Sequence, residues 1–78
     1  KLKTILIMRK VAINVEFNGK NIISNYSEFT EEEIKGLQKF CQTAASGSIS
    51  YLKIESGNKE YYFPKQIIEH SIISLVYA

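Results

Sequence analysis

The sequence contains no Asp and no Trp, and it has only one Cys, one His, one Pro and one Arg among its 78 residues. A single Cys41 excludes an intramolecular disulfide, and one Cys together with His70 falls short of the four ligands of a structural zinc site. We therefore expect no metal and no cofactor. A small domain without such staples depends on its hydrophobic core or on a partner subunit.

Long hydrophobic runs are also missing. The longest near the start covers residues 5–8, far fewer than the roughly 20 of a membrane-spanning helix, and no signal-peptide cleavage site follows it. We therefore expect a cytoplasmic protein with no membrane partner. Lys, Ile, Asn and Tyr are frequent, and their A/T-rich codons favour an A/T-rich bacterium or one of its phages as the source.

What is present is the composition of one small globular domain spanning residues 1–78. Hydrophobic residues make up 45% and charged residues 23%, and the net charge is +2. Met8 is the only Met, which leaves open whether residues 1–7 are native. If they are, their isoleucines share the parity of Val11 and predict an extra strand or a strand extension. The alternative is an arm that packs on a neighbouring molecule.

Residues 10–17 predict a strand that ends in a tight hairpin. Apolar residues alternate with more polar ones along this stretch, which is the period-2 pattern of a half-buried strand. The apolar positions are Val11, Ile13, Val15 and Phe17. Asn18-Gly19 follows directly, and both residues of such a two-residue turn need a positive φ. We expect this turn to place Val15 opposite Ile22 in the returning strand.

The next segment predicts a helix over about residues 31–45. Thr30 is a favourable N-cap, and Glu33 completes a capping box with it. Three consecutive glutamates occupy the first turn, where the helix dipole favours negative charge. Apolar residues recur at helical spacing, namely Ile34, Leu37, Phe40, Cys41, Ala44 and Ala45. Gly47 is suited to the position just past the C-cap, where the helix ends.

The last third predicts a second hairpin, with strands over residues 48–55 and 60–63 and a turn centred on Gly57-Asn58. We favour the register that places Lys53 opposite Tyr62, because it collects the apolar residues of both strands on one face. Those residues are Leu52, Ile54, Tyr61 and Phe63. The same register sets Glu55 opposite Glu60, which is mildly unfavourable.

The chain closes with a helical turn over residues 64–70, with Pro64 at its first position, and a strand over residues 71–77. That last strand is apolar on both faces and therefore needs a central place in a sheet or cover from a neighbouring subunit. The predicted fold class is α+β, an antiparallel or mixed sheet with one helix packed on one face. The predicted order is ββαββ(turn)β.

Residues with reactive side chains all have plain structural explanations. Cys41 lies in the apolar stripe of the helix, far from its N-terminus, so nothing there activates the thiol. His70 is expected to be exposed near the end of the helical turn. Consecutive glutamates in a first turn point in different directions and do not converge on one ion. We therefore predict no enzymatic activity and no catalytic or metal-binding residue.

A candidate interaction face comprises Tyr51, Lys53, Tyr62, Lys59 and Lys65. In the favoured register the first three share the outer face of the second hairpin, and the other two lie nearby. Tyrosine is enriched at protein interfaces, and aromatics interleaved with lysines can also stack bases and neutralise phosphates. The plain alternative is a solvent-facing sheet surface, where tyrosine is favoured by β-propensity alone.

These features favour a small non-enzymatic protein-interaction or self-assembling module, with a protein partner or a second copy in a homo-oligomer such as a dimer. The alternative is weak nucleic-acid binding that relies on backbone contacts and is sensitive to salt. Arg9 is the only arginine, whereas arginine supplies most bidentate contacts to bases and phosphates. If Lys1 and Lys3 are not native, the net charge falls to zero and this alternative loses its electrostatic support.

Overall fold

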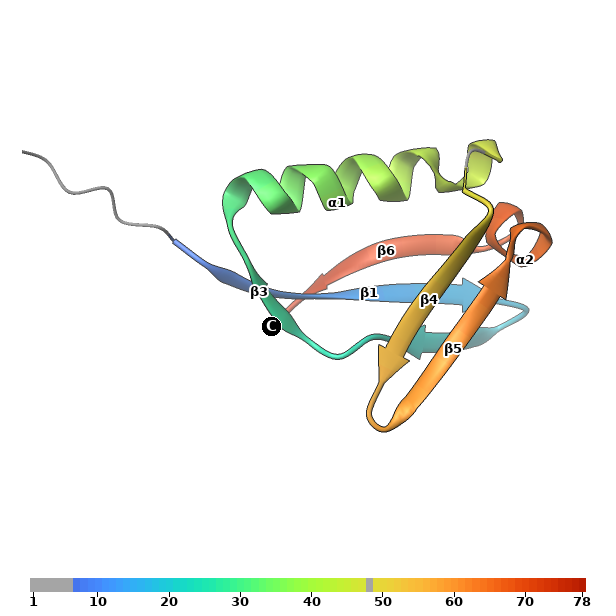
Figure 1. Cartoon of the computed structure of the whole chain (residues 1–78), viewed down its shortest axis with the longest axis horizontal. Coiled ribbons are helices and arrows are strands. Elements are labelled where there is room, and N and C mark those ends of the chain that lie inside the picture. Colours follow the sequence, from blue (N-terminus) through green and yellow to red (C-terminus); the bar gives the residue numbers. More distant parts are fainter. Residues whose placement is uncertain (1–6, 48) are drawn as a thin grey trace, which may run out of the picture.

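Two antiparallel sheets and one main helix form a small α+β fold (Figure 1). The computed structural model describes residues 7–47 and 49–78. The strands are β1 (Arg9–Phe17), β2 (Lys20–Ile23), β3 (Ser27–Phe29), β4 (Tyr51–Ser56), β5 (Lys59–Pro64) and β6 (Ile72–Tyr77). The helices are α1 (Glu31–Thr43), a 3-10 turn over Ala44–Ser46, and α2 (Lys65–Glu69).

The first hairpin is confirmed as predicted. Asn18 and Gly19 take φ values of 53° and 75°, the two positive values that the tight turn requires. Val15 lies opposite Ile22 in the resulting register of β1 and β2. Odd-numbered residues of β1 therefore share one face of the sheet with Ile22, and this face carries the core.

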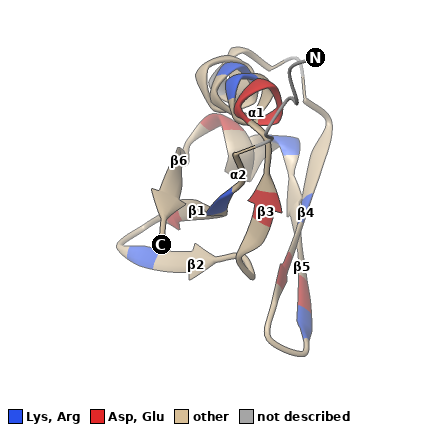
Figure 2. Ribbon diagram, turned by 90° about the vertical axis from the view of Figure 1, so that its left-hand side faces the viewer, with Lys and Arg blue, Asp and Glu red and all other residues tan. Residues whose placement is uncertain are grey.

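β1 is the central strand of the larger sheet. It pairs with β6 over residues 11–16, with β2 over residues 14–17, and with β3 over residues 9–11. β6 lies along one edge of β1, and β2 and β3 follow one another along the other edge (Figure 2). The predicted order ββαββ(turn)β is not confirmed, because β3 is an additional strand. Its three residues are too few to show an alternating pattern, and it forms only because β1 is there to pair with.

Of the two alternatives for the last strand, the central position is not found, because β6 pairs with β1 alone among the described strands and forms an edge. Cover from a neighbouring subunit stays a prediction. The N-terminal extension of β1 reaches back only to Arg9. Ile7 and Met8 are in no strand and are 74% and 44% exposed. The remaining residues of that extension, 1–6, lie outside the described residues.

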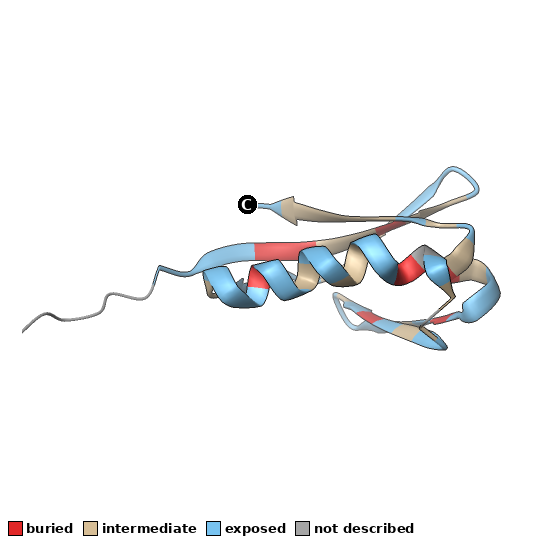
Figure 3. Ribbon diagram, turned by 90° about the horizontal axis from the view of Figure 1, so that it is seen from above, coloured by how far each residue is buried: buried red, intermediate tan, exposed pale blue. Residues whose placement is uncertain are grey.

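α1 begins with the predicted capping box. The Glu33 amide donates to Thr30 Oγ1 at 3.3 Å, and the Thr30 amide donates to Glu33 Oε1 at 2.9 Å. The α-helix ends at Thr43, two residues earlier than predicted, and a 3-10 turn leads to Gly47, whose φ is 85°. The helix runs over β1, with β6 on one side of it and the β4–β5 hairpin on the other (Figure 3).

The core lies between the larger sheet, the β4–β5 hairpin and the two helices. One cluster of its buried residues comprises Val15, Ala44, Ile54, Phe63 and Ile68. The predicted helical turn is α2. It begins at Lys65, so Pro64 is its N-cap and not its first helical residue as predicted. Ile68 from α2 is completely buried, so this short helix closes one end of the core. Among residues 7–47 and 49–78, no helix has the length and apolar character needed to cross a membrane.

Candidate functional site

The second hairpin has the predicted register. Lys53 lies opposite Tyr62, and Ile54 lies opposite Tyr61. Because side chains alternate along a strand, Tyr51, Lys53 and Tyr62 share the outer face, while buried Ile54 and Phe63 point to the core. Tyr51 and Tyr62 are 64% and 61% exposed. We call Tyr51, Lys53 and Tyr62 the tyrosine face.

The structure separates the other two candidate lysines from this face. Lys59 lies opposite Ser56 beside the turn, and strand parity directs it to the opposite side of the hairpin. Lys65 is the first residue of α2, and its side chain lies close to Gly47. Lys53 is therefore the only one of the three candidate lysines on the tyrosine face.

Two glutamates, which the sequence analysis did not include among the site residues, complete the face. Lys53 Nζ lies 3.4 Å from Glu55 Oε2 and 3.7 Å from Glu60 Oε2. The Tyr62 hydroxyl donates to Glu60 Oε1 at 2.7 Å. Glu55 and Glu60 are opposite each other as predicted, and Lys53 offsets their repulsion. The signal available in the sequence was parity, since both glutamates share the strand parity of the face.

This network shifts the pKa values of its members. Glu60 and Glu55 raise the pKa of the Lys53 ammonium. The hydrogen bond from Tyr62 and the charge of Lys53 lower the pKa of Glu60, and the same bond to Glu60 raises the pKa of the Tyr62 phenol. One lysine between two carboxylates gives the face a net charge of about −1 at neutral pH. Both signs of charge are visible along β4 and β5 in Figure 2.

We expect Tyr62→Phe to raise the pKa of Glu60 toward that of an ordinary glutamate, because it removes the largest cause of the lowering. Since folding lowers this pKa, the stabilisation from Glu60 is present above its unfolded-state pKa and is lost as the pH falls through the folded-state value. An NMR pH titration of the Glu60 carboxyl carbon measures the change. Tyr51→Phe is the matched control and should leave the lowered pKa of Glu60 unchanged. Equal titration midpoints in all three proteins would contradict the hydrogen bond.

The reactive residues remain apart from this face. Cys41 is half-buried on α1, and burial raises the pKa of its thiol, which is the reverse of an activated nucleophile. His70 is exposed at the C-cap of α2. Glu33 serves as the partner of Thr30 in the capping box. In the part of the chain that the structure describes, no three His, Cys, Asp or Glu side chains gather into a group that could hold a metal ion.

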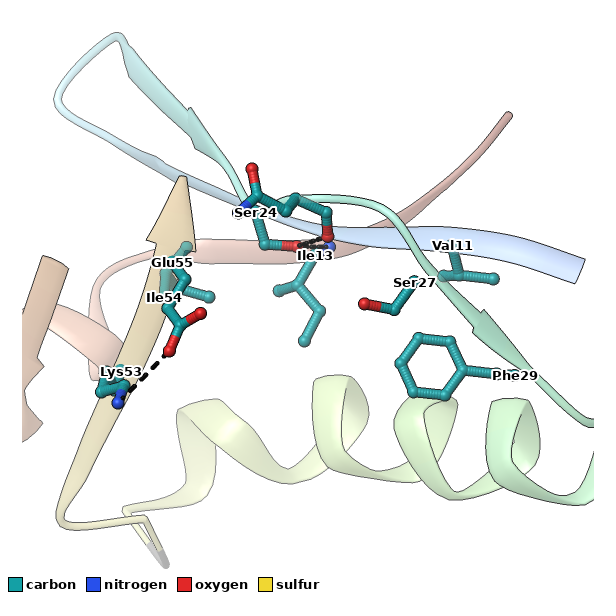
Figure 4. Close-up of a pocket in the computed structure, with 9 residues that line it drawn as sticks. Val11, Ile13, Ser24, Ser27, Phe29, Lys53, Ile54 and Glu55 are labelled. Atoms are coloured by element: carbon teal, nitrogen blue, oxygen red, sulfur yellow. Dashed lines mark hydrogen bonds and ion pairs between the residues drawn. The ribbon is translucent and has the colours of Figure 1, made fainter. Parts of the chain in front are cut away.

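A pocket of about 190 Å³ opens between β4 and the strands β1 and β3, above α1 (Figure 4). The Asn25 amide, which donates to the Glu55 carbonyl at 2.8 Å, ties β4 to the β2–β3 connection beside the pocket. The lining has an apolar part, Val11, Ile13, Phe29 and Ile54, and a polar part, Ser24, Asn25, Ser27, Lys53 and Glu55. Its volume is below the range of about 300–1,000 Å³ for small-molecule sites.

The candidate site thus combines the tyrosine face, its two glutamates and the adjoining pocket. Lys53 and Glu55 belong to both parts, so a molecule that covers the face also reaches the pocket rim. Comparisons of this chain with protein-family models, with curated proteins and with solved structures find no match.

Proposed function

We propose that this chain is a non-enzymatic protein-interaction or self-assembling module that contacts a protein partner through the tyrosine face. The observation that carries the proposal is the exposure of Tyr51 and Tyr62, at 64% and 61%, side by side on one face. Tyr62 and Tyr51 are diagonal neighbours across the hairpin, a separation that two aromatic side chains can bridge. Tyrosine is enriched at protein interfaces and is frequent among the residues that dominate binding energy.

The ion pairs and the hydrogen bond of the face support this proposal. Tyr62 is held by its bond to Glu60, and Lys53 is drawn to both glutamates. Side chains ordered before binding lose less conformational entropy on association. The face therefore offers a partner an amphipathic surface on which the side chains of Lys53 and Tyr62 are already held by contacts within the chain.

The adjoining pocket supports a protein partner over a small substrate. A cavity of about 150 Å³ is enough to hold a benzene-sized group, and this pocket measures about 190 Å³. It therefore accommodates one apolar side chain of a partner that also covers Lys53 and Glu55. Such an anchor in an apolar pocket is typical of the centre of a protein interface.

Nucleic-acid binding is the second candidate, because exposed aromatic rings can stack bases. The charge of the face argues against it. The only lysine on the face, Lys53, lies between Glu55 and Glu60, so the surface near the rings repels phosphates at neutral pH. We therefore rank a protein partner first.

The proposal is tested by selecting peptides from a displayed random library on the purified protein. We expect enriched peptides to carry an aromatic or aliphatic anchor and to bind the Tyr51→Ser/Tyr62→Ser variant at least about tenfold more weakly, because that variant removes both rings. Tyr26→Ser is the matched control, since Tyr26 is also exposed, at 45%, but lies outside the face. Thermal melts of all variants should coincide.

Labelled single-stranded and duplex oligonucleotides, titrated by fluorescence anisotropy at low and physiological salt, test the second candidate. No binding at low salt supports the protein-interaction proposal. Salt-sensitive binding that Lys53→Glu abolishes would favour nucleic acid instead. Peptides that bind the double variant as tightly as the original chain would overturn the role of the tyrosine face.

A further inference from the structure

The outer edge of β6 carries backbone groups that no described strand pairs. On β1, the Lys10 carbonyl accepts from the Ala78 amide at 3.1 Å, so Lys10 and the other even-numbered residues of β1 direct their backbone groups toward β6. Ile13 faces the opposite edge, because its carbonyl accepts from the Ser24 amide at 2.8 Å. This alternation determines which residues of β6 bond to β1.

All six residues of β6 lie opposite residues of β1, but only the even-numbered ones direct their backbone amides and carbonyls toward β1. Ser74 lies opposite Asn14 and Val76 opposite Ala12, so their backbone groups bond to β1. By alternation, the amides and carbonyls of Ile73, Leu75 and Tyr77 point away from β1. β6 thus presents three donors and three acceptors along an open edge.

Within the described residues, this edge lacks three features with which soluble proteins protect edge strands, namely charged side chains, Pro and a bulge. Residues 71–78 contain no charged residue and no Pro. The register between β1 and β6 runs through six consecutive pairs with no bulge. Charged side chains, Pro and bulges are the usual means of preventing unwanted strand pairing. Their absence indicates an edge that is covered in the functional protein.

We propose that a second copy of this chain covers the edge, with the two β6 strands antiparallel about a two-fold axis at Leu75. This register sets Leu75 opposite its own copy and Ile73 opposite Tyr77 of the second copy. Every outward backbone group of these three residues then finds a partner, because residues of like parity pair as hydrogen-bonded pairs. The uncharged sequence lets the strand face itself without placing like charges opposite each other.

The side chains on this register match as well as the backbone. Ile73, Leu75 and Tyr77 point to the face that α1 covers, since Tyr77 Oη accepts from Gln38 Nε2 at 3.4 Å. Ile73 and Leu75 are only half-buried in one copy. Pairing would extend this apolar row across the axis and join the two larger sheets into one. The dimer rests on the self-assembly part of the proposed function, but it leaves the tyrosine face free.

Sedimentation equilibrium over a range of concentrations tests the dimer with two variants of one residue. Leu75→Ala shortens the side chain and keeps the amide, whereas Leu75→Pro also removes the amide, which points away from β1. We expect the original chain and Leu75→Ala to dimerise. The dissociation constant of the Leu75→Pro dimer should be about a hundredfold higher than that of the Leu75→Ala dimer. Circular dichroism should show that both variants fold.

Amide hydrogen exchange of the original chain provides a second readout that needs no variant. We expect the amides of Ile73, Leu75 and Tyr77 to become protected as the concentration rises, while those of Ser74 and Val76 are protected throughout. A chain that stays monomeric at millimolar concentration, or a dimer that leaves these three amides unprotected, would overturn the inference. Peptide binding by the tyrosine face would survive that result, so the two proposals fail separately.

Discussion

Ile68→Ala should lower the free energy of unfolding by about 3 kcal/mol, within the range of 2–5 kcal/mol for truncating a buried isoleucine. Ile68 is 0% exposed and lies in one cluster with Val15, Ile54 and Phe63. α2 has only five residues, so it cannot form a stable helix alone and depends on this contact. The empty volume would also border the hairpin that carries the tyrosine face.

Urea denaturation followed by circular dichroism measures this loss. A domain of this size has a total stability on the order of 5–10 kcal/mol, so the variant should stay folded in water at 25 °C and unfold completely at a clearly lower urea concentration. Ile67→Ala is the matched control, because Ile67 is the neighbouring isoleucine on the same helix but is only partly buried. Equal losses for the two variants would show that α2 packs on the core through another face.

Gly19→Val should destabilise the protein by about 1–3 kcal/mol, the cost of holding a residue in a sparsely populated backbone conformation. Gly19 has a φ of +75°, which a β-branched residue resists. No atom beyond its chain neighbours lies within 4 Å of the position of an added Cβ, so the penalty comes from the backbone and not from a clash. Loss of the turn would also weaken the pairing of β1 with β2.

The same substitution at Gly36 is the matched control. Gly36 lies inside α1, where an added Cβ also meets no atom within 4 Å and the φ is not positive. Valine is slightly better than glycine in a helix interior, so Gly36→Val should leave the midpoint of thermal unfolding nearly unchanged. Equal shifts for the two variants would mean that the strain at the turn is not the cause.

Elements whose signals are local could be predicted from their own residues. The Asn18-Gly19 dipeptide specified a tight turn because its two residues tolerate positive φ, and the turn then placed Val15 opposite Ile22. Thr30 and Glu33 specified the start of α1 because their side chains reach amides only three residues away. The alternation along the second hairpin was enough to put Tyr51, Lys53 and Tyr62 on its outer face.

Strand parity already placed Glu55 and Glu60 on the outer face, but the ion pairs of the candidate site needed the tertiary structure. Glu55 and Glu60 form ion pairs with Lys53. The geometry of these pairs depends on the conformations of three long side chains on two strands. Lys65 shares a stretch of sequence with the face but lies on α2, because the chain turns after Pro64. Nearness in sequence was therefore a poor guide to nearness in space for these charged residues.

The place of each strand in the sheets was likewise decided by tertiary packing. β3 has too few residues for a pattern of its own and forms by pairing with β1. β6 is apolar on both faces, which predicted either a central strand or cover from a neighbouring subunit, and it pairs only with β1 among the described residues. A strand's own residues determine which faces avoid water, whereas its neighbours depend on the packing of the whole chain and of any second copy.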